Sequence, residues 1–157
     1  MAILYLMVGL PCSGKTTRAK VLEHEVRALR FTPDEWQVRL FGHDTLDPEH
    51  DKRHSILEDM LWQIAARALS LGTNSILDFG FWAKEERDDY RSRAQKLGVR
   101  SEIVFMDVAE EELMKRVRMR NENLTSTIAY IPEDLMLPWI QFFQRPDADE
   151  LRPREID

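Results

Sequence analysis

The chain has 157 residues, of which 43% are hydrophobic and 32% are charged, and its formal net charge at pH 7 is −6. This acidic balance argues against a broad surface for nucleic acid, and no apolar run approaches the length of a membrane span. The single cysteine excludes an internal disulfide, and the absence of a signal segment predicts a cytoplasmic protein.

The chain begins with an apolar run that leads directly into a glycine-rich loop. Residues 3–8 are typical of a buried strand, and residues 9–16 read Gly-Leu-Pro-Cys-Ser-Gly-Lys-Thr. This loop fits the pattern G-x-x-x-x-G-K-[ST] at every fixed position, and a helix is predicted over about residues 15–29. A strand, loop and helix in this order predict a cradle for the phosphates of a nucleoside triphosphate. The alternative is a glycine-rich turn before an ordinary helix, which the preceding strand disfavours.

Each residue type in this loop has a physical reason. Gly9 and Gly14 permit backbone conformations in which successive N–H groups point at one anion. The ammonium of Lys15 suits the β- and γ-phosphates, and the hydroxyl of Thr16 suits a hard cation such as Mg²⁺. The predicted nucleotide-binding residues are Gly9, Pro11, Cys12, Ser13, Gly14, Lys15, Thr16, Thr17 and Arg116.

The next part of the chain contains a short strand and two helices. A second strand is predicted over residues 29–32, followed by one or two helical turns over residues 35–41. A capping sequence at residues 47–49 begins a longer helix that ends at residue 71. The apolar residues at helical spacing that we expect to face the core are Ile56, Met60, Leu61, Ile64, Ala65 and Ala68.

The alternation of strands and helices continues to the end of the chain. Strands are predicted over residues 74–80 and 101–107, with a charged helix over residues 84–97 between them. The last two predicted helices cover residues 110–120 and 132–143.

This order predicts an α/β fold of three layers, in which helices flank a mainly parallel sheet of four to five strands. We expect one domain over residues 1–157, with about residues 146–157 forming an edge segment or a tail.

Three aspartates follow predicted strands, at the edge of a parallel sheet where ligands gather. Asp34 suits a general base, because one helix and one return strand separate it from Lys15; the alternative is an N-cap. Asp78 could hold Mg²⁺ through water or orient the acceptor, and the alternative is a turn residue at the strand end. Asp107 is explained by helix capping and stays outside the predicted site.

Arginines provide the candidate cations. Arg116 and Arg120 are one helical turn apart and share a face that could reach a phosphate, whereas a solvated face with Arg116 paired to Glu112 is the alternative. Arg87 and Arg91 are weaker candidates for binding a charged acceptor, and we expect them on a solvated face.

The four histidines lack the spacing of a metal site, although His50 and His54 are one helical turn apart. We therefore propose no zinc site. Trp36 and Trp82 follow the candidate strand ends and are candidates for walls of an acceptor pocket.

Four segments together resemble a known family: residues 9–17, Thr-Pro-Asp-Glu-Trp at 32–36, Leu-Asp-Phe-Gly-Phe-Trp at 77–82 and Arg-Val-Arg-Met-Arg-Asn at 116–121. The chain resembles the small P-loop kinases grouped as zeta-toxin-like or AAA-domain ATP-binding proteins, which include chloramphenicol phosphotransferase and the kinase domain of polynucleotide kinase. The resemblance implies an ATP-dependent phosphotransferase with strand order 2-3-1-4-5, an aspartate base at Asp34 and a lid arginine at Arg120. A fifth strand is not obvious, which leaves residues 143–150 as the candidate for the adenine side.

The leading interpretation is a kinase that uses ATP and Mg²⁺ to phosphorylate a hydroxyl of a small molecule. Lys15, Asp34 and Arg120 are the predicted catalytic residues, and Thr16 and Asp78 are the predicted metal ligands. One alternative is a switch protein that binds or hydrolyses ATP and acts through a partner; another is a kinase for a nucleic-acid 5′-hydroxyl end, which the net charge disfavours. No membrane partner is expected, and both a monomer and a homodimer remain open.

Overall fold

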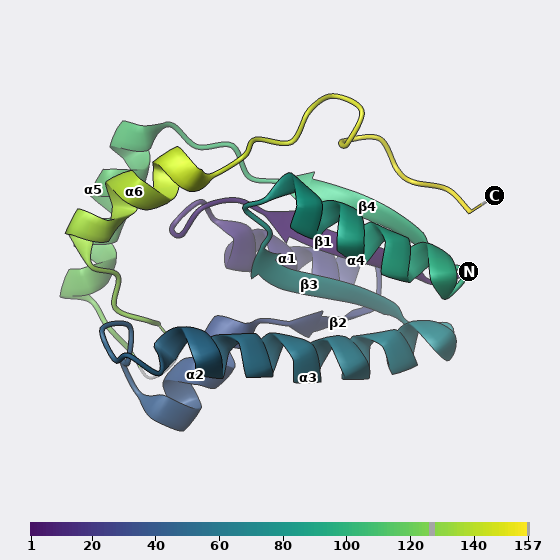
Figure 1. Cartoon of the computed structure of the whole chain (residues 1–157), viewed down its shortest axis with the longest axis horizontal. Helices are drawn as coiled ribbons and strands as arrows, with labels where there is room; N and C mark the ends of the chain where they lie inside the picture. The colour runs from purple at the N-terminus through teal and green to yellow at the C-terminus, as the bar shows by residue number, and fades with distance from the viewer. Residues whose placement is uncertain (126–127, 157) are drawn as a thin grey trace.

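The computed structural model describes residues 1–125 and 128–156 and contains all the predicted strands and helices (Figure 1). In chain order the elements are β1 (Ile3–Val8), α1 (Lys15–Glu25), β2 (Ala28–Phe31), α2 (Pro33–Phe41), α3 (His50–Ser70), β3 (Asn74–Gly80), α4 (Lys84–Lys96), β4 (Arg100–Phe105), α5 (Glu110–Glu122) and α6 (Glu133–Phe142). Within these described residues, no helix combines the length and the apolar character needed to cross a membrane.

The four strands form one sheet in the order β2-β3-β1-β4, and every pair is parallel. The family resemblance implied this same order for the first four strands. Parallel strands bring their carboxyl ends to one edge, where α5 and α6 also lie (Figure 1). The described residues contain no fifth strand.

The alternation of side chains along β1 divides the core into two layers. Leu4, Leu6 and Val8 pack with residues of α3 and α4 on one face of the sheet. Tyr5 and Met7 pack with residues of α1 on the other face. The predicted three-layer α/β fold is therefore confirmed.

The expected core face of α3 is partly wrong. Ile56, Met60 and Ile64 are about half exposed, at 51%, 53% and 49%. The buried residues of this helix are Leu57, Leu61, Ala65, Ala68 and Leu69. The helix has apolar residues on more than one side, and the sheet covers the stripe that lies one residue further along the chain than the predicted one.

The expectation of a solvated face for Arg87 and Arg91 is also wrong, because both side chains are buried, at 0% and 2% exposure. Arg87 Nε donates to Glu150 Oε1 at 2.7 Å, and Arg91 Nη1 donates to the Glu150 carbonyl at 2.6 Å. The C-terminal segment after α6 returns along β4, where Ser101 and Arg154 form an antiparallel bridge. The two arginines on α4 therefore attach this segment to the edge of the sheet.

Candidate functional site

The loop between β1 and α1, residues 9–14, is compact, because its backbone bonds to β3 and the side chain of Ser13 lies close to Gly9. Gly9 N donates to the carbonyl of Gly80 on β3 at 3.1 Å, and a Cβ atom at Gly9 would lie 2.6 Å from Ser13 Oγ. Gly14 has φ +90° immediately before α1, a conformation that favours glycine. Ser13 Oγ is buried and has no hydrogen-bond partner in the described part of the chain. The loop therefore requires glycine at both motif positions, and the N-terminus of α1 that follows it is suited to binding an anion.

Lys15 and Thr16 place two functional groups at this helix start. Lys15 Nζ donates to the carbonyl of Leu10 at 3.1 Å, so the ammonium is held over the loop. Thr16 Oγ1 donates to Asp78 Oδ2 at 2.6 Å, and Thr32 Oγ1 donates to the same oxygen at 3.1 Å. These bonds connect the glycine-rich loop of residues 9–16, called the phosphate loop below, to the ends of β2 and β3.

Asp78 is 4% exposed. Burial raises its pKa, which the charge of Lys15 and the hydroxyl of Thr16 partly oppose. Its second oxygen, Oδ1, has no hydrogen-bond partner in the described residues. A buried carboxylate with one free oxygen, next to a threonine hydroxyl, fits the oxygen ligands that Mg²⁺ prefers. Thr16 and Asp78 are therefore compatible with the predicted metal site.

Two arginines of α5 extend over the other side of the loop. Arg116 Nη1 donates to the Cys12 carbonyl at 3.2 Å, and Arg120 Nη1 lies 3.7 Å from Cys12 Sγ. Arg116 also pairs with Glu112, as the alternative interpretation had it, with Nε 2.9 Å from Oε1. Arg118 points away and pairs with Glu133 on α6. The structure thus brings Arg116 and Arg120 to the phosphate loop from one helical face.

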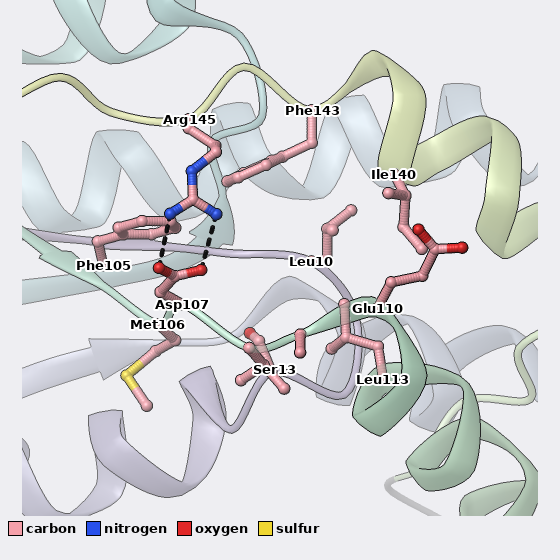
Figure 2. A pocket seen from close by; sticks show the side chains of 12 residues that line it. Leu10, Ser13, Phe105, Met106, Asp107, Glu110, Leu113, Ile140, Phe143 and Arg145 are labelled. Atoms are coloured by element: carbon pink, nitrogen blue, oxygen red, sulfur yellow. Dashed lines mark hydrogen bonds and ion pairs between the residues drawn. The ribbon is translucent and has the colours of Figure 1, made fainter.

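A cavity of about 260 Å³ lies beside the loop (Figure 2). Figure 2 shows Arg145 joined to Asp107 by two hydrogen bonds, of 2.8 and 2.6 Å, next to the ring of Phe105. Phe143 and Arg145 are among the lining residues, so the candidate for the adenine side borders this cavity. Its occupation by a base stays a prediction.

Asp34 lies in the first turn of α2, at the same edge of the sheet. Thr32 occupies the N-cap position, so Asp34 is not the N-cap of this helix. Its side chain is 59% exposed, and His54 Nδ1 lies 3.7 Å from Oδ1. Trp36 is exposed, whereas Trp82 packs against Trp139 of α6.

The sequence interpretation missed a polar cluster next to Asp34. Gln37 of α2, His54 and Glu58 of α3 are joined by hydrogen bonds and ion pairs, and Glu86 of α4 interacts electrostatically with His54 and Glu58. Burial and the charge of Glu58 raise the pKa of Glu86 to about 7. The turn-apart spacing of His50, His54 and Glu58 was the signal in the sequence, but no motif connected these residues to Gln37 or Glu86.

Comparison with solved structures finds the same fold at low identity. A candidate kinase from Chloroflexus aurantiacus is 20% identical, with a TM-score of 0.65 over 76% of this chain and 65% of that chain. A chain of the Pnkp1/Rnl/Hen1 RNA repair complex is 21% identical, with a TM-score of 0.71 over 99% of this chain and 49% of that one. Chaetomium thermophilum Kti12 in complex with ADP-AlF3 is 19% identical, with a TM-score of 0.72 over 93% of this chain and 82% of the Kti12 chain.

This chain therefore spans less than two thirds of the first two proteins. A search of curated protein sequences finds no match. The family model described as AAA domain matches residues 4–146. Its match includes the phosphate loop, both aspartates and the two arginines of α5, which confirms the resemblance recognised in the sequence. The chain belongs to the AAA domain family of P-loop proteins.

Proposed function

We propose that the protein is an ATP-dependent phosphotransferase that transfers the γ-phosphoryl group of ATP to a hydroxyl of a small molecule. One observation carries this proposal: two aspartates at neighbouring strand ends have different environments. Asp78 is buried and hydrogen-bonded to Thr16 of the phosphate loop, while Asp34 is largely exposed. This difference suits a division of roles in which Asp78 serves the nucleotide side and Asp34 serves the acceptor.

In the proposed reaction the acceptor oxygen attacks the γ-phosphorus of ATP. A new P–O bond forms, the bond from the γ-phosphorus to the bridging oxygen breaks, and ADP leaves. Asp34 takes the proton of the acceptor hydroxyl. Lys15, the loop N–H groups and the guanidinium groups of Arg116 and Arg120 offset the negative charge of the phosphate oxygens. A Mg²⁺ ion held by Thr16 and Asp78 would supply further positive charge there.

The charges near Asp34 favour a neutral or cationic acceptor. Glu58 and Glu86 add two carboxyl groups to this region, where His54 Nε2 lies 3.1 Å from Glu58 Oε1. An acceptor with a carboxylate or phosphate would meet repulsion from these groups. The net charge of −6 acts in the same direction.

The test is ATP consumption by the purified protein with Mg²⁺ and a panel of sugars, nucleosides, amino sugars, sugar acids and 5′-hydroxyl oligonucleotides. Stimulation by one class is expected, and Lys15→Ala should abolish it. Lys20→Ala is the matched control, because Lys20 is an exposed lysine of the same helix. Asp34→Asn should lose phosphorylation of the acceptor while it retains ATP binding; full activity of this variant would contradict the role of Asp34.

The second candidate is phosphorylation of a nucleic-acid 5′-hydroxyl end. The similarity to a chain of an RNA repair complex favours it. In that case the oligonucleotides would stimulate ATP consumption, and their binding would weaken strongly with salt. Tight ATP binding with no stimulation by any acceptor would instead support the ATP-dependent switch.

A further inference from the structure

The amide of Gln37 has one possible orientation. Its nitrogen Nε2 lies 3.1 Å from Asp44 Oδ2 and 3.1 Å from the His50 carbonyl oxygen, and both of these atoms are acceptors. The other end of the amide is then the oxygen Oε1, which also accepts. This oxygen lies 3.0 Å from Nδ1 of His54. His54 Nδ1 must therefore carry a hydrogen to make this bond.

The second ring nitrogen of His54 also faces an acceptor. Nε2 lies 3.1 Å from Glu58 Oε1. An imidazole that donates from both nitrogens is protonated and carries a positive charge. The side chain is one quarter exposed, at 25%, so its hydrogen bonds are partly shielded from water.

The surrounding charges agree with this protonated state. Burial lowers the pKa of His54, but the hydrogen bond to Glu58 and the charges of Asp34, Glu58 and Asp51 outweigh burial, and the pKa is raised. The ring of His50 stacks on His54 at 6.0 Å between centroids, and Glu86 interacts with His54 from α4.

The protonated ring lies beside the predicted base. Asp34 has no hydrogen bond or ion pair in the described residues other than its contact with His54, 3.7 Å from Oδ1 to Nδ1. An exposed carboxylate on a first helical turn otherwise samples several rotamers.

We propose that protonated His54, fixed by Gln37 and Glu58, is a positioning residue that holds the carboxylate of Asp34 at the acceptor side of the site. This inference rests on the proposed function. The positive charge attracts the carboxylate of Asp34 across 3.7 Å and limits its rotation. As the pH rises through the pKa of His54, the ring loses a proton, one of its two hydrogen bonds and its charge, so the rate of phosphoryl transfer falls.

The first experiment measures the His54 ring directly, by NMR titration of ¹⁵N-labelled histidine in the whole protein. Both ring nitrogens should be protonated at neutral pH. Asp34→Asn and Glu58→Gln should each move the His54 titration to lower pH, because each removes a negative charge beside the ring. A neutral ring at pH 7, or a titration that Asp34→Asn does not move, overturns the proposal. This measurement does not depend on catalysis.

The second experiment follows ATP turnover with Mg²⁺ and water as acceptor, between about pH 6 and pH 9. An unperturbed histidine changes charge between about pH 5 and pH 8, and the pKa of His54 is raised. His54→Gln should lower kcat about tenfold without a change in KM for ATP, a fraction of the 10²–10⁴-fold that general bases contribute. His54→Lys, which keeps a cation at higher pH, should restore turnover at the alkaline end. Persistence of the wild-type alkaline decline in both variants overturns the positioning role.

Two control variants test whether another titrating group causes the alkaline decline in ATP turnover. His43→Gln changes an exposed histidine and should leave the pH profile as it is. Glu86→Gln removes a neighbouring group whose pKa is raised to about 7, and the alkaline decline should persist in this variant. If the wild-type protein turns over no ATP with water or with any acceptor of the panel, the proposed function fails, and the NMR titration alone supports or overturns the pairing of His54 with Asp34.

Discussion

Replacing Glu86 with glutamine should stabilise the protein at neutral and alkaline pH. The pKa of Glu86 rises from an ordinary value of 4.5 to about 7, chiefly through burial and then through repulsion by Glu58. At about 1.4 kcal/mol per pH unit this shift corresponds to roughly 3 kcal/mol, and solvent screening of a partly exposed group reduces it to about 1.5 kcal/mol. The ionised carboxylate destabilises the fold by this amount, and glutamine removes the charge while it retains the shape.

The sign of the effect depends on pH. Between the two pKa values the folded state binds more protons than the unfolded state, so the stability of the wild type falls as the pH rises through this window. Thermal melts should show Glu86→Gln about 4 °C above the wild type near pH 8, since about 1 kcal/mol shifts the Tm of a domain of this size by roughly 3 °C. Near pH 4 the two proteins should melt together. Glu85→Gln is the matched control, because Glu85 is exposed and adjacent and the change in net charge is the same. Equal shifts for both variants, or a gain that persists near pH 4, would refute the reasoning.

Three further changes test other parts of the structure. Arg87→Met leaves the carboxylate of Glu150 buried without its partner and should cost about 3–5 kcal/mol in the free energy of unfolding, measured by denaturant melts; a cost below about 1 kcal/mol would contradict the proposed attachment. Gly9→Ala should weaken ATP binding in calorimetry through the 2.6 Å contact with Ser13 Oγ, and adding Ser13→Ala should recover part of the loss; no recovery would locate the strain elsewhere. Asp78→Asn should raise the Tm, because it removes a buried charge, and should weaken binding of ATP with Mg²⁺; unchanged dependence on Mg²⁺ would argue against a metal role.

The phosphate loop and the order of elements could be predicted because they depend on local signals. Gly9, Gly14, Lys15 and Thr16 have fixed spacing, and the alternation of strand and helix patterns leaves few parallel arrangements. The edge at which Asp34 and Asp78 lie follows from this topology alone.

The wrong predictions concern side chains whose burial depends on tertiary contacts. The rotation of α3 could not be read from its sequence, because Ile56 and Leu57 are equally apolar and only the position of the sheet selects one of them. Arg87 and Arg91 looked like surface residues because the C-terminal segment that buries them lies about sixty positions later in the chain. His54 and Glu58 share α3, but Gln37 and Asp34 come from α2, and no joint motif connects the two helices.

The C-terminal segment has a further consequence for the solubility of the protein. An open strand edge exposes unpaired N–H and C=O groups that can pair with another chain and start aggregation. Residues after α6 pair with β4 at one position, where Ser101 and Arg154 exchange two backbone hydrogen bonds. At the opposite edge β2 has only four residues and carries the charged Arg30. Both edges of the sheet are thus poor templates for an incoming strand, one because the C-terminal segment already occupies part of it and the other because it is short and carries a charged residue.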